Sequence, residues 1–161
     1  YFTEAINGEA QKCRADFTAS EDDNVLVQGV AGDKYSLGFF GYAYYVENKD
    51  KIKVVPIDSG HGPVAPTATT INNGTYAPLS RAIFIYVAPK AADRPEVAAF
   101  VKFYLDNAAA LATEVGYVPL PDGVYELAKQ RFEKRVAGTV YGEGSKGKPL
   151  TELFKMEKSR M

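Results

Sequence analysis

The run with the clearest potential for chemistry is residues 142–148 (Gly-Glu-Gly-Ser-Lys-Gly-Lys). It has the Gly-x-x-x-x-Gly-Lys spacing of a loop that holds phosphate with backbone N–H groups and a lysine. The Ser or Thr that would bind Mg²⁺ at the next position is replaced by Pro149, which also removes a backbone donor. We therefore expect a surface loop here rather than a nucleotide site.

His61 and Cys13 are the single histidine and the single cysteine of the chain. His61 lies between glycines and could act as a base, yet no sequence feature supplies an orienting carboxylate or a nucleophile. A catalytic Cys13 would need a histidine partner, and His61 lies in an unrelated loop. One cysteine excludes an internal disulfide, and one cysteine with one histidine disfavours a Cys/His zinc site. We expect no metal and no cofactor; in an oxidising compartment Cys13 could pair with a cysteine outside these residues.

An acidic run, residues 20–24 (Ser-Glu-Asp-Asp-Asn), precedes a helical pattern. Serine and acidic residues are favoured at helix N-caps and in first turns. A calcium loop would need more oxygen ligands at fixed offsets. A helix start can bind an anion through its free N–H groups, but three adjacent carboxylates would repel an anion that carries no proton. We expect capping to be the main role of this run, with a protonated anion as the alternative.

Two further patterns have simple structural explanations. Asn73-Gly74-Thr75 fits a glycosylation sequon and, more simply, a turn. Tyrosines at positions 35, 42, 44 and 45 could line a cleft, although aromatic residues are also common in α/β cores. These residues do not form a catalytic set.

The composition excludes several classes of protein. The chain has 161 residues, 46% of them hydrophobic, with 19 Lys and Arg against 20 Asp and Glu. Nucleic-acid-binding proteins usually have a basic excess, so we expect no nucleic-acid partner. The longest apolar run, residues 82–88, is far too short to span a bilayer. The chain starts at Tyr1 without Met or an apolar leader, which is typical of a mature or truncated polypeptide.

Helical periodicity alternates with strand-like segments along the chain. It predicts a short helix ending at Asn7-Gly8, a helix after residues 20–23 that is closed at Gly32, and helices over residues 42–46, 94–115 and about 124–132. Strands are expected over residues 35–41, 52–57 and 83–87. The last strand is apolar on both faces, which predicts a buried central strand. The alternation indicates an α/β protein.

The order of these pieces carries a resemblance to a known family. The most specific stretch is residues 16–30, with Thr-Ala-Ser-Glu-Asp-Asp-Asn-Val-Leu-Val-Gln-Gly-Val over 18–30. Gly-Phe-Phe-Gly-Tyr over 38–42, Pro-Leu-Ser-Arg over 78–81 and Val-Gly-Tyr-Val-Pro-Leu over 115–120 support it. Together they resemble the phosphate-binding component of the bacterial phosphate ABC transporter, a type II periplasmic binding protein.

The resemblance implies a two-lobed, doubly wound α/β protein that closes on inorganic phosphate with high affinity. Such a protein delivers phosphate to the membrane permease of an ABC transporter and is periplasmic or otherwise extracytoplasmic, soluble or anchored as a lipoprotein. Residues 1–80 would be the remainder of the second lobe, residues 81–135 the crossover strand and the helices returning to the first lobe, and residues 136–161 a C-terminal tail segment.

The resemblance also places most ligands outside this chain. The family's Ser-Gly-Thr phosphate loop would lie immediately before Tyr1, in an N-terminal half that would be the partner of these residues. A two-lobed binder needs roughly twice this length, at about 100–200 residues per domain. Within the chain, Ser20 and Asn24 at a helix start and Tyr42 near the hinge are expected to line the cleft, and the isolated chain is expected to bind phosphate poorly.

Two other classes of function remain open from the residues. One is a catalytic α/β domain, such as a hydrolase that uses His61 or the glycine-rich loop. The other is a structural or signalling module that kept the fold without a ligand. Phosphate and related oxyanions such as arsenate fit the resemblance equally.

Overall fold

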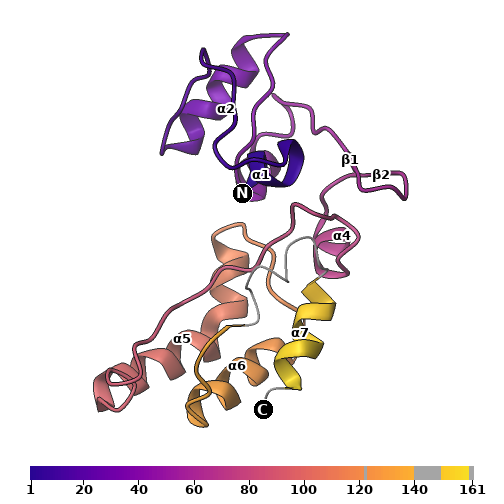
Figure 1. Ribbon diagram of the computed structural model, residues 1–161. Coiled ribbons are helices and arrows are strands. Elements are labelled where there is room, and N and C mark those ends of the chain that lie inside the picture. Colours follow the sequence, from indigo (N-terminus) through magenta and orange to yellow (C-terminus); the bar gives the residue numbers. More distant parts are fainter. Residues whose placement is uncertain (122, 140–149, 160–161) are drawn as a thin grey trace. The chain divides into compact units, whose positions relative to one another are not determined.

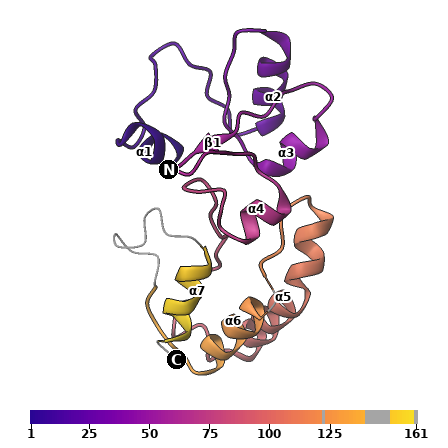
Figure 2. The same cartoon turned by 90° about the vertical axis from the view of Figure 1, so that its right-hand side faces the viewer.

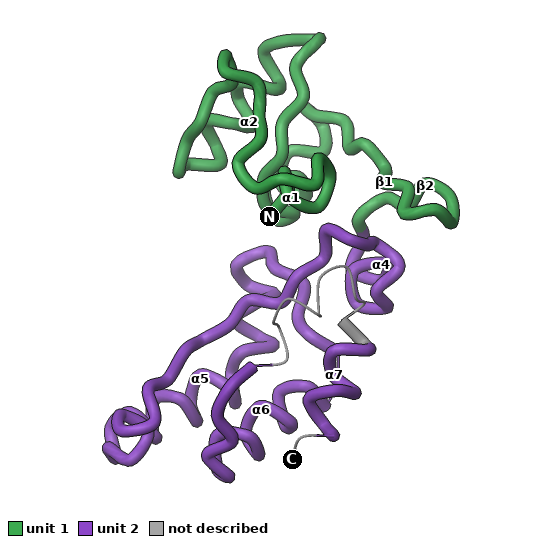
Figure 3. The backbone as a smooth tube through the Cα atoms, in the orientation of Figure 1, with its two compact units in different colours: residues 1–66 green, residues 67–161 purple. Residues whose placement is uncertain are grey.

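The structure, a computed structural model, describes residues 1–121, 123–139 and 150–159. It divides into two compact units, Tyr1–Pro66 and Thr67–Met161, which Figure 3 colours separately. This boundary after Pro66 separates compact units, whereas the boundary predicted after residue 80 separates the two lobes of a larger protein. The lobe boundary stays a prediction. The glycine-rich run of residues 142–148 lies outside the described residues.

The first unit contains helices α1 (Phe2–Asn7), α2 (Asp23–Gly32) and α3 (Tyr42–Glu47), of which Figure 1 labels the first two and Figure 2 all three. A short antiparallel ladder joins β1 (Ile57–Asp58) to β2 (Pro63–Val64), with Ile57 opposite Val64. All three helices lie where the sequence predicts them. The first ends at Gly8, whose φ of 77° is the left-handed conformation that glycine adopts readily after a helix.

The second unit contains α4 (Ala68–Asn72), α5 (Pro95–Glu114), α6 (Val124–Glu133) and α7 (Leu150–Lys158) (Figure 2). Helices α5 and α6 confirm the predicted helices, and Pro95 occupies the first turn of α5, where its missing N–H is not needed. Helix α4 was not predicted. The sequence feature that marks its start is a capping box, in which the side-chain oxygens of Thr67 and Thr70 each accept a hydrogen bond from the other residue's backbone N–H.

None of the three predicted strands forms over its predicted length in the described structure. Residues 35–41 and 83–87 form no strand, and of residues 52–57 only Ile57 joins a ladder. The predicted burial of residues 83–87 is also wrong, because Ile83 is 65% exposed and Tyr86 is 89% exposed. A strand requires a neighbouring strand to pair its backbone groups, and within the described residues only β1 and β2 pair with each other.

Candidate functional site

The start of α2 brings together two of the three predicted site residues. The Ser20 hydroxyl accepts a hydrogen bond from the Asp22 N–H at 3.0 Å and donates to the Asp22 carbonyl at 3.1 Å. The Asp22 carboxylate is the N-cap and accepts from the Asn24 backbone N–H at 2.9 Å and from its side-chain amide at 3.1 Å. Ser20 and Asn24 are thus both ordered around Asp22, which agrees with capping as the main role of this run.

Tyr42, the third predicted residue, begins α3, which packs against α2. The two helix starts lie close together, because a methyl group added at Gly41 would stand 3.8 Å from the Asp23 Oδ2 atom and 3.5 Å from the Tyr44 ring. The Tyr42 ring is tilted against Tyr45, with centroids 6.1 Å apart. The fold therefore places these three side chains on neighbouring helix starts of one unit.

The starts of α2 and α3 form a corner of the first unit that combines neutral hydrogen-bond donors with carboxylate acceptors. Hydroxyl, amide and backbone N–H groups can donate to an oxyanion, and the half-buried Asp23 can accept from an anion that carries a proton. One orphan donor of the helix start, the Asn24 N–H, is already bonded to Asp22. The corner is therefore suited to supplement a binding site rather than to hold a bare anion alone.

The other chemical candidates are placed differently. His61 is exposed in the turn between β1 and β2, where the neighbouring Asp58 carboxylate accepts from the backbone N–H groups of Gly60 at 2.7 Å and Gly62 at 3.0 Å. Those bonds shape the turn, so they give no support to a catalytic His61. Cys13 is an exposed free thiol.

The Asn73-Gly74-Thr75 sequence forms the predicted turn. The Asn73 side-chain oxygen accepts hydrogen bonds from the Thr75 N–H at 3.0 Å and from the Thr75 hydroxyl at 2.7 Å. Gly74 follows with a φ of 77°. These contacts explain the Asn-Gly-Thr sequence as a turn that its own side chains stabilise.

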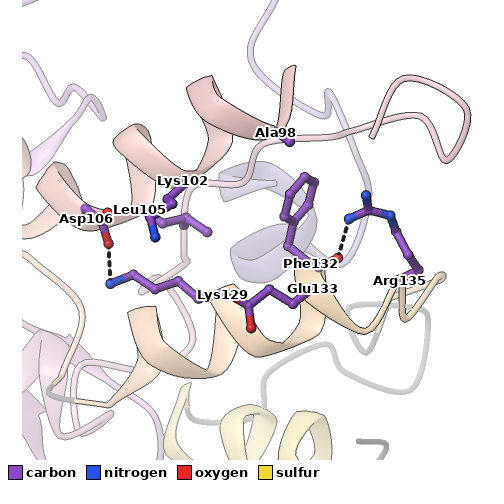
Figure 4. Close-up of a pocket in the computed structure, with 8 residues that line it drawn as sticks. All are labelled: Ala98, Lys102, Leu105, Asp106, Lys129, Phe132, Glu133 and Arg135. Carbon is purple, nitrogen blue, oxygen red and sulfur yellow. Dashed lines mark hydrogen bonds and ion pairs between the residues drawn. The ribbon is translucent and has the colours of Figure 1, made fainter. Parts of the chain in front are cut away.

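A hollow of about 360 Å³ lies between α5 and α6 in the second unit (Figure 4). Two of its charged side chains, Lys129 and Asp106, pair with each other, and Arg135 is held by groups beside the hollow. Lys129 reaches Asp106 at 2.6 Å, and Arg135 donates to the Ala92 carbonyl at 2.7 Å while its guanidinium lies 4.8 Å from the centre of the Phe132 ring. The remaining lining residues are Ala98, Lys102, Leu105 and Glu133.

The ion pair in the hollow shifts two titrations in opposite directions. The hydrogen bond from Lys129 is the main cause that lowers the pKa of Asp106, and the same bond is the main cause that raises the pKa of Lys129. Both shifts favour the charged forms of the two side chains, so the pair is an ion pair that links α5 to α6. The sequence did not single out these residues, because 23 positions separate them and no local pattern connects them.

The described residues contain neither a cluster of metal-ligand side chains nor a membrane-spanning helix. In the ranges 1–121, 123–139 and 150–159, no group of three or more His, Cys, Asp or Glu side chains could hold a metal ion. Over the same part of the chain, none of the helices has the length and apolar character to cross a membrane.

Comparison with known proteins gives consistent matches. Residues 9–108 match the model of a PBP superfamily domain. The chain is 50% identical to Protein SphX of Synechocystis over 161 residues, which is 99% of the chain and 48% of that protein. It is 43% identical to the phosphate-binding protein PstS of Staphylococcus aureus over 107 residues, 65% of the chain and 32% of PstS.

A solved structure shares the fold. A possible phosphate binding protein from Planctomyces limnophilus aligns with a TM-score of 0.68 and 47% identity, covering 84% of this chain and 49% of that one. The chain thus spans about half the length of SphX and of the solved protein. This chain belongs to the PBP superfamily and has part of the α/β fold of a type II periplasmic binding protein.

Proposed function

We propose that the protein to which these residues contribute binds inorganic phosphate with high affinity outside the cytoplasm and delivers it to the permease of an ABC importer. The observation that carries the proposal is the 43% identity to a protein named for phosphate binding, together with 47% identity to a solved possible phosphate binding protein. The protein would act by binding and not as an enzyme.

The corner formed by the starts of α2 and α3 supports this proposal chemically. Neutral donors at Ser20, Asn24 and Tyr42 would face the ligand without a net positive charge, the Ser20 hydroxyl exchanging its present bond to the Asp22 carbonyl for one to the ligand. An adjacent Asp23 carboxylate would accept from protonated phosphate and repel an oxyanion that has no proton to donate. Selection of a protonated tetrahedral oxyanion therefore needs no basic surface, in agreement with the net charge of −1.

We further propose that residues 1–80 belong to one lobe, that residues 81–135 return to the other, and that residues 136–161 form a tail. The principal phosphate ligands would lie in the other part of a two-lobed protein. Ser20, Asn24 and Tyr42 would then line the cleft from one side only. For this reason the 161 residues alone should bind phosphate weakly.

The test is calorimetric titration of orthophosphate into the protein encoded by the whole gene and into the 161-residue chain. We expect tight binding by the whole protein and weak or no binding by the chain. Ser20→Ala in the whole protein should lower the affinity roughly tenfold, the value of one hydrogen bond to a charged ligand.

Ser36→Ala is the matched control, because the Ser36 hydroxyl donates to the Val30 and Asp33 carbonyls at the other end of α2. It should leave the affinity for phosphate unchanged. Micromolar binding by the 161 residues alone would refute the division of the ligands. Absence of binding by the whole protein would refute the function.

A further inference from the structure

The hollow between α5 and α6 is framed by a polar contact at each end (Figure 4). At one end, Lys129 of α6 pairs with Asp106 of α5 at 2.6 Å. At the other end, Arg135 donates to the Ala92 carbonyl at 2.7 Å and lies 3.4 Å from the Asp93 carboxylate. Both contacts link the segment of α6 to the segment of α5, so they hold the two walls of the hollow in place.

The inner surface of the hollow is mainly apolar. Ala98, Leu105 and Phe132 line it, and all three residues are partly buried. Its volume of about 360 Å³ lies within the range of about 300–1,000 Å³ that is usual for small-molecule pockets. Such pockets combine an apolar lining with a few convergent polar groups. The hollow therefore has the size and the apolar surface to hold one small organic molecule.

Two charged side chains that line the hollow are left without a partner. The two framing contacts use three of its five charged residues. Among the residues that the structure describes, the side chains of the other two, Lys102 and Glu133, make neither an ion pair nor a hydrogen bond. Lys102 extends from α5 and Glu133 from α6, and both are exposed to solvent (Figure 4). One free positive charge and one free negative charge thus remain, one on each wall.

The opposite signs of these two charges restrict the class of ligand. A simple anion would be attracted by the Lys102 ammonium group and repelled by the Glu133 carboxylate, and a simple cation would experience the reverse. A zwitterion can accept a charge-assisted hydrogen bond from Lys102 while its own ammonium group donates one to Glu133. An apolar group on the same molecule would cover Leu105 and the Phe132 ring. A free α-amino acid with an apolar side chain combines these three features.

We infer that the hollow between α5 and α6 is a binding site for a free α-amino acid with an apolar side chain. Lys102 binds its carboxylate, Glu133 binds its ammonium group, and Leu105 and Phe132 contact its side chain. The site lies within the second unit and shares no residue with the corner formed by the starts of α2 and α3. Amino-acid binding here therefore does not depend on the proposed phosphate function.

The exposure of the two charged side chains sets a modest affinity. Water competes with the ligand for both Lys102 and Glu133, and a molecule as small as leucine makes few contacts. We expect a dissociation constant of about 1 mM for leucine.

The experiment is an NMR titration of the protein encoded by the whole gene, in which shifts of the backbone amides of α5 and α6 report where the ligand binds. Leucine is the probe. Isocaproate has the same apolar chain without the ammonium group, and isoamylamine has it without the carboxylate. Leucine should shift the amides that line the hollow, and each analogue should bind at least tenfold more weakly because it loses one charge-assisted hydrogen bond.

Two substitutions that remove a charge test the two ends of the ligand separately. Lys102→Gln and Glu133→Gln should each weaken leucine binding at least tenfold. Glu133→Gln also removes the repulsion of a simple anion, so this variant should bind isocaproate more tightly than the unmodified protein does.

Lys90→Gln and Glu114→Gln are the matched controls, because both residues are exposed in the second unit and neither lines the hollow. Each should change the affinity for leucine less than twofold. Thermal unfolding checks the folding of every variant, and Lys102→Gln and Glu133→Gln should unfold like the unmodified protein because both side chains are exposed and unpaired. Orthophosphate binding is measured on the same samples and should be the same in all of them.

Three outcomes would overturn the inference: no shift of the lining amides with leucine, equal affinities of the unmodified protein for leucine and isocaproate, or equal effects of Lys102→Gln and Lys90→Gln. Leucine binding without orthophosphate binding would refute the proposed function and leave the amino-acid site intact. Orthophosphate binding without leucine binding would refute only the amino-acid site.

Discussion

Among the glycines of the first unit, Gly38 has the least room for a side chain. A Cβ atom added there would lie 2.6 Å from the Val30 Cγ2 atom and 3.2 Å from the Phe40 ring. Contacts below 3.0 Å require one group to move. Val30 lies on α2, where a β-branched side chain has essentially one χ1 rotamer, so it has little freedom to move away.

The substitution Gly38→Ala should therefore destabilise the first unit. Overpacking of this kind costs about 1–3 kcal/mol. Loss of glycine's freedom in the unfolded chain offsets about 0.4–1 kcal/mol of that. We expect a net loss of about 1–2 kcal/mol in the free energy of unfolding.

The assay is urea unfolding followed by circular dichroism, with Gly29→Ala as the matched control. Gly29 lies inside α2, and a Cβ atom added there would meet nothing within 4 Å. Alanine should therefore stabilise the helix there by about 0.5–1 kcal/mol. The two substitutions are chemically identical and are expected to have opposite signs.

A double-mutant cycle with Val30→Ala identifies the cause. If the Val30 side chain is the obstacle, Gly38→Ala should cost much less in the Val30→Ala background than in the unmodified chain. A Gly38→Ala variant as stable as Gly29→Ala, or one whose cost is unchanged by Val30→Ala, would refute the packing of residue 38 against α2.

Three further predictions concern the second unit. Thr67→Ala removes the N-cap of α4 and should cost about 1 kcal/mol of unfolding free energy in urea, whereas Thr67→Ser should restore most of it. Because the folded chain lowers the pKa of Asp106, the ionised carboxylate stabilises the fold at a pH above its unfolded-state pKa, and this stabilisation is lost as the pH falls below about 4. Asp106→Asn should therefore reduce the dependence of the unfolding free energy on pH at the acid end. An unchanged dependence would contradict the ion pair with Lys129. Arg131 contacts the buried Glu157 of α7, so Arg131→Ala should leave that carboxylate unpaired, cost about 3–5 kcal/mol and release α7 to limited proteolysis; an α7 as resistant as before would refute the contact.

The sequence alone determined helices α1, α2, α3, α5 and α6 and the cap at the start of α2. Helix α5 follows from local apolar spacing and Pro95, and α2 begins after an acidic cap whose bonds span only two residues. The capping partners of Ser20 and Asn24 are local for the same reason. Such features are set by residues within one or two turns, so they can be predicted from the residues that carry them.

The tertiary structure decided the pairings between distant residues. The ion pair between Lys129 and Asp106 links α6 to α5. The close contact of Gly38 with the Val30 side chain packs the loop after α2 against that helix. Residues 83–86 have the composition of a strand but form none in the described structure, because strand formation depends on the backbone of a separate segment. Helical hydrogen bonds are internal to each helix, whereas strand hydrogen bonds and ion pairs between helices require a partner that only the folded chain can place.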